Sequence, residues 1–288
     1  GRLHILMESV KLKRLLREPG YLERLSAVVG ARLCRPGGEQ EGEGRVSLME
    51  AEPLCASVGI ASLKKKGETV SGDRGTYFKT EQGVLCIILS DGMGSGEEAA
   101  KESVAVVRIL ERFLRAGMEP ATAMKILNSM MLLKNGESWG FATVDLMCID
   151  LFTGETAFYK YGAAPSYVRS GSTVKRIRSE SLAAGLRGGA DVMPDMVRLR
   201  LKPGSLALIA SDGVIAETND AWLRTLPQED AIRARELLDG APAETEAETR
   251  LRDCAAQFRR LLESVTAQDR QISLRMGGQR SFYRTFRS

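Results

Sequence analysis

Hydrophobic positions along this chain change their spacing, and the spacing predicts which elements form. Residues 53–63 and 84–89 are short apolar runs with small or β-branched side chains, which is typical of strands, and the second run indicates a buried one. Over residues 95–117 the apolar positions recur every three or four residues, as on one face of a helix. A second helix is predicted over residues 119–133.

Short apolar runs return after residue 140, separated by turn sequences such as Thr-Gly-Glu and Lys-Pro-Gly. This spacing is typical of antiparallel strands joined in a meander. The predicted strands are residues 141–151, 156–161, 166–169, 174–177, 196–201 and 205–210. Two helical patterns follow, and a last apolar segment lies at residues 272–276. The order of elements predicts an α+β sandwich and not an alternating parallel sheet.

The first part of the chain has a different pattern. Apolar positions within residues 5–33 stand among many Arg and Lys side chains and are interrupted at Pro19-Gly20, which predicts two short amphipathic helices. Residues 35–44 form a polar, glycine-rich connector and give the best boundary. The predicted parts are an N-terminal helical linker or regulatory segment (1–45), a main domain (46–278) and a C-terminal tail (279–288).

Composition narrows the class of protein. The net charge of +4 is the small difference between 41 basic and 37 acidic residues, so nucleic acid is not an expected partner. Five cysteines without a close pair favour a reducing compartment, and no uninterrupted apolar stretch of about 18 residues is present to span a bilayer. Because the chain begins at Gly1 and not at methionine, we expect a fragment of a longer protein. We also expect a cytoplasmic domain whose parent protein is anchored in the membrane through an upstream region.

Two segments of the chain have the same sequence pattern. Residues 84–92 are VLCIILSDG and residues 205–213 are SLALIASDG, so each apolar strand ends in Ser-Asp-Gly. Such an ending places a carboxylate at the rim of a sheet, where glycine lets the backbone approach a bound ion. If the two strands are neighbours, Asp91 and Asp212 meet, and a divalent cation would relieve their repulsion. Oxygen ligands favour Mg²⁺ or Mn²⁺.

Other aspartates are candidates for the same centre or for structural roles. Asp73 precedes Asp91 by about one hairpin, and Asp269 stands just before the last apolar segment, so both are placed to join the pair. Asp145 and Asp150 share one predicted strand but face opposite sides of the sheet. For these two we expect structural hydrogen bonds or solvent exposure and not catalysis.

The glycines after the first of these strands raise a second possibility, a phosphate-binding loop. Gly92, Gly94 and Gly96 have the spacing G-x-G-x-G, whereas a dinucleotide-binding turn needs G-x-G-x-x-G and a P-loop needs a following Lys and Ser or Thr. Glu97 and Glu98 come next, and their negative charge suits the N-terminus of a helix better than it suits a phosphate. A direct anion site is therefore disfavoured, and nucleotide binding is the least favoured alternative.

The ordered set of motifs resembles the phosphatase domain of the stage II sporulation protein E family, metal-dependent serine/threonine phosphatases of the 2C type. The resemblance covers roughly residues 50 to 276. It is carried by SGD at 71–73, SDGMGSG at 90–96, TVDLMCIDL at 143–151, YGAAPSYVRSG at 161–171 and IASDGV at 209–214. A lone Asp-Gly would carry no weight, but the ordered set is specific.

The resemblance implies a β-sandwich of two antiparallel sheets flanked by helices, with a binuclear Mn²⁺ or Mg²⁺ centre at one edge. Carried over by position, Asp91 would bridge both ions and the Gly92 carbonyl would bind one of them. The other ligands would be Asp73, Asp212 and Asp269. Asp91 and Asp212 are the implied catalytic residues, because water activated at this centre would attack the phosphate.

The chain departs from the family pattern in two places. Residues 268–270 are Gln-Asp-Arg, where the family usually has Asp-Asp or Asp-Asn followed by Met-Thr, so Arg270 places a positive charge beside the expected ligand Asp269. The only histidine is His4, outside the main domain. Protonation of the leaving group must then come from metal-bound water or an unidentified group.

The implied function is a protein-serine/threonine phosphatase that dephosphorylates an anti-anti-sigma factor and so activates a sporulation sigma factor. In the family the helix pair, here residues 95–117 and 119–133, acts as a switch on the metal loop. The resemblance also implies contact with the cell-division tubulin homologue through the parent protein, and a homodimer is a further possibility. The alternative is a regulatory or scaffolding module that keeps the fold with weak catalysis.

Overall fold

The computed structural model describes residues 2–8, 18–35, 45–56, 58, 70–94, 96–134, 140–186 and 192–212, and the statements below concern these residues. The chain divides into two compact units. The first contains residues 1–57 with 267–285, and the second contains residues 58–266 with 286–288. Within the described ranges, no helix is long and apolar enough to cross a membrane.

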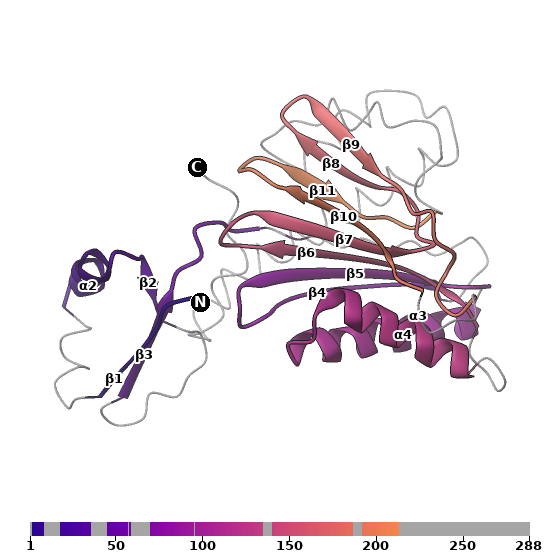
Figure 1. Cartoon of the computed structure of the whole chain (residues 1–288), viewed down its shortest axis with the longest axis horizontal. Coiled ribbons are helices and arrows are strands. Elements are labelled where there is room, and N and C mark those ends of the chain that lie inside the picture. Colours follow the sequence, from indigo (N-terminus) through magenta and orange to yellow (C-terminus); the bar gives the residue numbers. More distant parts are fainter. Residues whose placement is uncertain are drawn as a thin grey trace. The chain divides into compact units, whose positions relative to one another are not determined.

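The first unit is a small three-stranded antiparallel sheet with one helix. Strands β1 (His4–Glu8), β2 (Leu33–Cys34) and β3 (Arg45–Glu50) have the order β1-β3-β2, and α2 (Tyr21–Val29) precedes β2. The unit is visible in indigo in Figure 1. Leu33, Val46 and Leu48 form its core, against which α2 packs Leu22 and Leu25.

The helices predicted in the first unit are only partly correct. The second exists as α2, which ends at Gly30, whose φ of 69° is the left-handed conformation that favours glycine. The first is wrong over residues 5–8, which belong to β1 and alternate in exposure, and residues 9–17 lie outside the described part. Local pattern missed this strand because its partner, β3, lies far along the chain.

The boundary between the units also differs from the expected one. Strand β3 follows the glycine-rich connector but pairs with β1 and β2, so the first unit continues to Ser57 and does not end at residue 45. Residues 53–56, the described start of the strand predicted over 53–63, are not a strand. They include Pro53, which has no N–H to donate to a sheet.

The described part of the second unit contains two antiparallel sheets. The first has the order β10-β7-β6-β5-β4 and the second the order β11-β8-β9. The strands of the first sheet are β4 (Asp73–Lys79), β5 (Val84–Gly92), β6 (Ala142–Asp150), β7 (Glu155–Tyr161) and β10 (Asp195–Arg200). Those of the second are β8 (Ser166–Ser170), β9 (Thr173–Ile177) and β11 (Leu206–Leu208). The predicted meander and the α+β class are confirmed, although β11 is shorter than expected.

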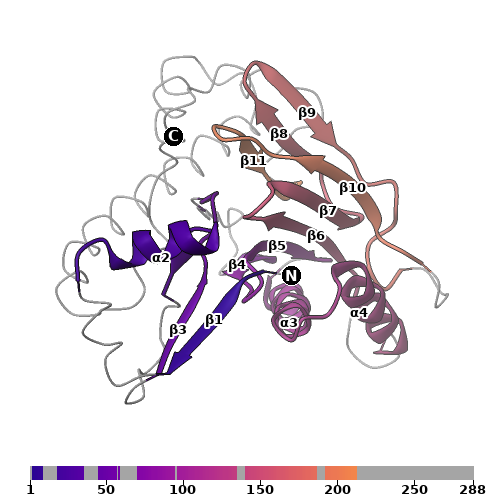
Figure 2. The same ribbon diagram turned by 60° about the vertical axis from the view of Figure 1, so that its left-hand side comes forward.

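Two helices cover one face of the five-stranded sheet. They are α3 (Gly96–Arg115) and α4 (Pro120–Lys134), and Figure 2 shows both on the same side of β4 to β7. The face that α3 turns inward carries Ala99, Val106, Val107, Leu110 and Leu114, which confirms the predicted helix periodicity. These side chains pack against the alternate strand residues, among them Cys86, Ile88, Val144, Leu146 and Tyr159. The helical patterns after residue 213 lie outside the described residues.

The opposite face of the same sheet points away from the helices. Because side chains alternate along a strand, Leu89 and Asp91 on β5 and Thr143 and Asp145 on β6 share this second face. Hydrogen bonds join it to the chain of the other sheet: Ser166 at the start of β8 donates to Asp145 on β6. The candidate functional residues are therefore on the face opposite to α3 and α4.

Candidate metal centre

Asp73 and Asp91 face each other across neighbouring strands. Asp73 is the first residue of β4, Asp91 is the penultimate residue of β5, and the antiparallel register pairs them directly. Burial, the charge of Asp73, a hydrogen bond with Asp73 and the charge of Asp212, in that order, raise the pKa of Asp91 from 3.8 to about 7. The hairpin predicted to bring Asp73 to Asp91 is confirmed.

Asp212 reaches the same place from the second sheet. It follows β11 by a few residues and lines the same cavity as Asp91. The sequence predicted this meeting on the condition that the two strands are neighbours, but β5 and β11 belong to different sheets. The two aspartates meet across the sandwich and not along one sheet edge.

Ser211 is a member of this cluster that sequence reasoning missed. Its side chain is buried, and its Oγ donates a 2.8 Å hydrogen bond to Asp73 Oδ2. The contact joins the segment after β11 to the first residue of β4, so it fixes Asp73 from the other sheet. The signal was present in the Ser-Asp-Gly sequence, but the partner of the hydroxyl depends on how the sheets pack.

Gly92 brings the end of β5 close to the first turn of α3. A Cβ built on Gly92 would lie 2.1 Å from the carbonyl oxygen of Ala99, so no other residue fits there without moving the helix. A Cβ built on Gly72 would lie 3.5 Å from Asp91 Oδ1 and 3.7 Å from the Gly92 carbonyl oxygen. Both oxygens therefore border the space beside Gly72.

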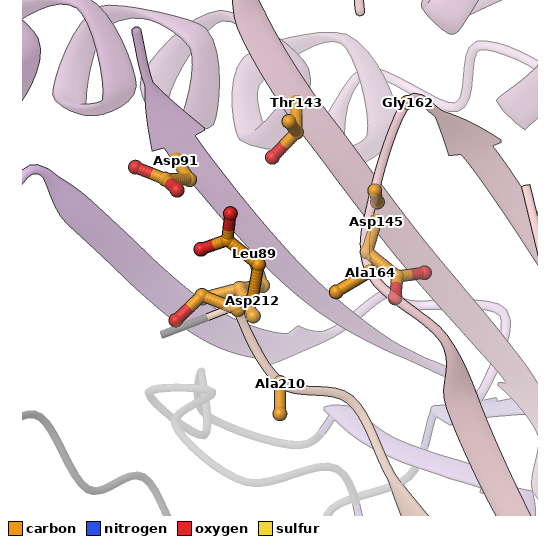
Figure 3. Close-up of a pocket in the computed structure, with 10 residues that line it drawn as sticks. Leu89, Asp91, Thr143, Asp145, Gly162, Ala164, Ala210 and Asp212 are labelled. Carbon is orange, nitrogen blue, oxygen red and sulfur yellow. The ribbon is translucent and has the colours of Figure 1, made fainter. Parts of the chain in front are cut away.

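A small cavity of about 40 Å³ lies beside these groups. Figure 3 shows Asp91, Thr143 and Asp145 on two neighbouring strands and Asp212 on the segment that follows β11. The remaining lining residues are Leu89, Gly162, Ala163, Ala164, Ala210 and Ser211. The cavity is bordered by three carboxylates, two hydroxyls and small side chains, so its polar lining consists of oxygen groups.

The oxygen groups around the cavity fit a divalent cation, although they are not arranged around one point. Asp91 is crowded by two other carboxylates, and replacing its proton by a cation would relieve the repulsion. Carboxylate and carbonyl oxygens are the ligands that Mg²⁺ and Mn²⁺ prefer. Within the described residues, however, no group of three or more His, Cys, Asp or Glu side chains is already arranged around one point. Asp269, the remaining predicted ligand, lies outside the described residues.

Asp145, which lines the cavity, forms a buried ion pair with Lys160. Lys160 Nζ donates to Asp145 Oδ2 and, over 2.7 Å, to Ser166 Oγ, and Ser166 Oγ also donates to Asp145 Oδ2. Burial raises the pKa of Asp145, and the charge of Lys160 opposes that shift. Burial likewise lowers the pKa of Lys160 against the charge of Asp145. The structural hydrogen bonding predicted for Asp145 is confirmed, but its place in the cavity was not foreseen.

Asp150, on the other face of β6, has the expected local role. Its Oδ1 accepts a 2.8 Å hydrogen bond from the backbone N–H of Phe152 in the turn that follows. It does not line the cavity. Asp145 and Asp150 therefore differ in function although they belong to the same strand.

Comparison with known proteins shows the family of this chain. The family model described as stage II sporulation protein E (SpoIIE) matches residues 81–272. The stage II sporulation protein E of Priestia megaterium is 31% identical over 189 residues, which is 64% of this chain and 32% of that protein. The protein of the same name from Bacillus subtilis (strain 168) is 30% identical over 188 residues, which is 64% of this chain and 22% of that protein. The chain thus spans a third or less of the length of these curated relatives.

Solved structures show the same fold. The PP2C phosphatase domain of SpoIIE from Bacillus subtilis, solved with a fragment of its regulatory domain, matches with a TM-score of 0.61 and 24% identity. The match covers 90% of this chain and 76% of that one. A structure reported for the bacterial stressosome gives a TM-score of 0.51 at 19% identity and covers 69% of this chain and 91% of that one. The chain belongs to the SpoIIE family and carries a SpoIIE-type PP2C serine/threonine phosphatase domain.

Proposed function

We propose that the second unit hydrolyses phosphoserine or phosphothreonine on a protein substrate with two Mn²⁺ or Mg²⁺ ions. The observation that carries the proposal is the meeting of Asp73, Asp91 and Asp212 from two sheets, with the pKa of Asp91 raised to about 7. Family membership supports the same activity. Such crowding of carboxylates has a cost in the folded chain, and a divalent cation removes it.

The residues of the chain have distinct roles in this proposal. Asp91, with the Gly92 carbonyl oxygen beside it, would hold the ions together with Asp73 and Asp212. Ser211 would keep Asp73 in place through its hydrogen bond. When bound, the ions supply Lewis-acid chemistry at the phosphoryl group. Asp269 is proposed as a further ligand from the family resemblance.

The family resemblance supports a more specific proposal for the substrate and the partners. We propose a phosphorylated anti-anti-sigma factor as the substrate, whose dephosphorylation activates a sporulation sigma factor. The chain would act in the cytoplasm as part of a longer protein that is anchored in the membrane upstream. Contact with the cell-division tubulin homologue and formation of a homodimer would then be properties of that longer protein.

The test is removal of phosphate from a phosphorylated anti-anti-sigma factor, followed by mass spectrometry of the phosphoserine peptide. We expect Mn²⁺-dependent loss of phosphate with the wild-type chain and none with Asp91→Asn. Asp150→Asn is the matched control, because Asp150 accepts a hydrogen bond in the turn after β6 and does not line the cavity. Phosphate loss that needs no metal, or that persists in Asp91→Asn, would contradict the proposal. Absence of activity in a folded, Mn²⁺-binding wild type would favour the regulatory or scaffolding alternative.

A further inference from the structure

The Asp145, Lys160 and Ser166 side chains form a closed polar cluster inside the second unit. Asp145 and Lys160 are each 1% exposed, and Ser166 is fully buried. Lys160 and Ser166 both donate to the same oxygen, Asp145 Oδ2. Among the described residues nothing donates to the other oxygen, Asp145 Oδ1, although it is buried. Asp145 Oδ2 therefore accepts two hydrogen bonds, whereas Asp145 Oδ1 accepts none from the described residues.

Asp145, which carries this Oδ1 atom, lines the same cavity as Asp91 and Asp212. Asp145 lies opposite Leu89 on β5, and Thr143 lies opposite Asp91, so Asp145 is one step along the same face from the proposed metal ligand. Figure 3 shows Asp145 on the strand next to that of Asp91, with Gly162 and Ala164 above and beside it. The cluster is therefore continuous with the candidate metal centre.

A buried carboxylate oxygen without a donor is costly, and the lowest-cost donor here is water. The cavity of about 40 Å³ exceeds the roughly 10–15 Å³ that one water needs. A water there would also meet the Thr143 and Ser211 hydroxyls or the Asp91 and Asp212 carboxylates as further partners. A cation is a poor alternative at this oxygen, because the Lys160 ammonium already neutralises the carboxylate.

We propose that Asp145 is a positioning residue of the phosphatase: Lys160 and Ser166 fix its carboxylate so that Oδ1 accepts a hydrogen bond from a water molecule in the Asp91–Asp212 cavity. The proposal rests on the proposed function. An ionised carboxylate only accepts hydrogen bonds, so it orients the water with one O–H toward Asp145 and its lone pairs toward the centre. The residue acts through that water and does not touch the substrate.

The Asp145→Asn variant separates this role from a structural one. The amide keeps the shape of the side chain, and its oxygen can still accept from Lys160 and Ser166, which turns the NH₂ group toward the cavity as a donor. We expect kcat on p-nitrophenyl phosphate to fall about 10- to 100-fold, while KM and the Kd for Mn²⁺ stay within about threefold of wild type. A purely structural role would lower the melting temperature without a selective loss of kcat.

Asp195→Asn is the matched control. It also replaces an aspartate by asparagine next to Lys160, but on β10 and not on β6. Asp195 on β10 pairs in register with Lys160. Its Oδ2 accepts hydrogen bonds from Ser179 Oγ and from the backbone N–H groups of Glu180 and Ser181, and it does not line the cavity. We expect its kcat to stay near wild type. An equal fall of kcat in both variants, or an unchanged kcat in Asp145→Asn, would overturn the proposal.

A crystal structure of the full chain with Mn²⁺ gives a second readout that needs neither a variant nor activity. We expect an ordered water about 2.7–3.0 Å from Asp145 Oδ1 in the wild type. If no water lies within hydrogen-bond distance of Asp145 Oδ1 in the wild type, the proposal is overturned even if the enzyme is active. If the wild type is inactive but the water is present, the proposed function fails and the assignment of the water site stands.

Discussion

Asp73 and Asp91 are direct cross-strand partners on β4 and β5, and each places a carboxylate on the same face of the sheet. Like charges opposite one another destabilise a strand pair. Burial, the charge of Asp73 and a hydrogen bond with it raise the pKa of Asp91 to about 7. Repulsion between the two carboxylates lowers the stability of the folded chain unless a proton or a cation is bound there. The first two predictions rest on this repulsion.

The stability of the metal-free chain should fall as the pH rises. The pKa of Asp91 is raised from 3.8 to about 7, so the folded chain binds this proton more tightly than the unfolded chain does. The contribution is complete below about pH 4 and is lost as the pH rises through about 7. We expect the melting temperature in EDTA to decrease over this window more in the wild type than in Asp91→Asn. Parallel pH profiles of the two proteins would contradict the raised pKa.

Binding of Mn²⁺ should stabilise the wild type and remove most of that pH dependence. At a free Mn²⁺ concentration of 100 times Kd, mass action predicts a gain of about 2.7 kcal/mol in the free energy of unfolding. Urea unfolding with and without Mn²⁺ at pH 7.5 measures the gain. The expected gain in Asp91→Asn is close to zero, whereas Asp150→Asn should respond as the wild type does.

Replacing Gly92 should destabilise the end of β5 and the start of α3 together. In Gly92→Ala the new methyl group would lie 2.1 Å from the Ala99 carbonyl oxygen, so the helix has to shift. We expect a loss of about 3 kcal/mol in urea unfolding and weaker Mn²⁺ binding. Gly171→Ala is the comparison, because nothing lies within 4 Å of its new Cβ and only its φ of 58° is unfavourable. Equal losses in the two variants would show that the contact with α3 is unimportant.

Removing the Ser211 hydroxyl should affect the metal centre more than the fold. Ser211→Ala loses the 2.8 Å hydrogen bond to Asp73, which should cost about 1 kcal/mol of stability. Because Asp73 is then no longer held from the second sheet, we expect Mn²⁺ affinity to fall about 10-fold by calorimetry. Ser170→Ala is the comparison, because it removes a partly buried hydroxyl contact, the 2.7 Å one to Ser205, whose residues do not line the cavity. An unchanged Mn²⁺ affinity in Ser211→Ala would exclude the positioning role.

The sequence was sufficient for the elements whose pattern is local. The period of α3, the strand runs from residue 142 to 200 and the Ser-Asp-Gly end of β5 follow from spacing and turn residues, whereas β11 ends at Leu208, before the second Ser-Asp-Gly sequence. The hairpin that brings Asp73 to Asp91 was also predictable, because β4 and β5 are joined by a short turn. These features depend on residues that are close in the chain.

Features that depend on distant partners were not predictable. Strand β1 pairs with β3 across the connector, and the alternation of its five residues was too short to outweigh the helical interpretation. The Asp145–Lys160 pair requires the register of β6 with β7, and its third member, Ser166, comes from the second sheet. A charged residue in each of two buried strands was the only signal in the sequence.

The most direct test of the metal centre is a Mn²⁺ titration followed by electron paramagnetic resonance, in the wild type, Asp91→Asn, Asp212→Asn and Asp150→Asn. If carboxylates from the two sheets share one centre, the wild type and Asp150→Asn bind Mn²⁺ alike, and both other variants lose affinity by about 10-fold or more. Wild-type affinity in Asp212→Asn would contradict the account, because Asp212 is the aspartate that the second sheet brings to Asp91.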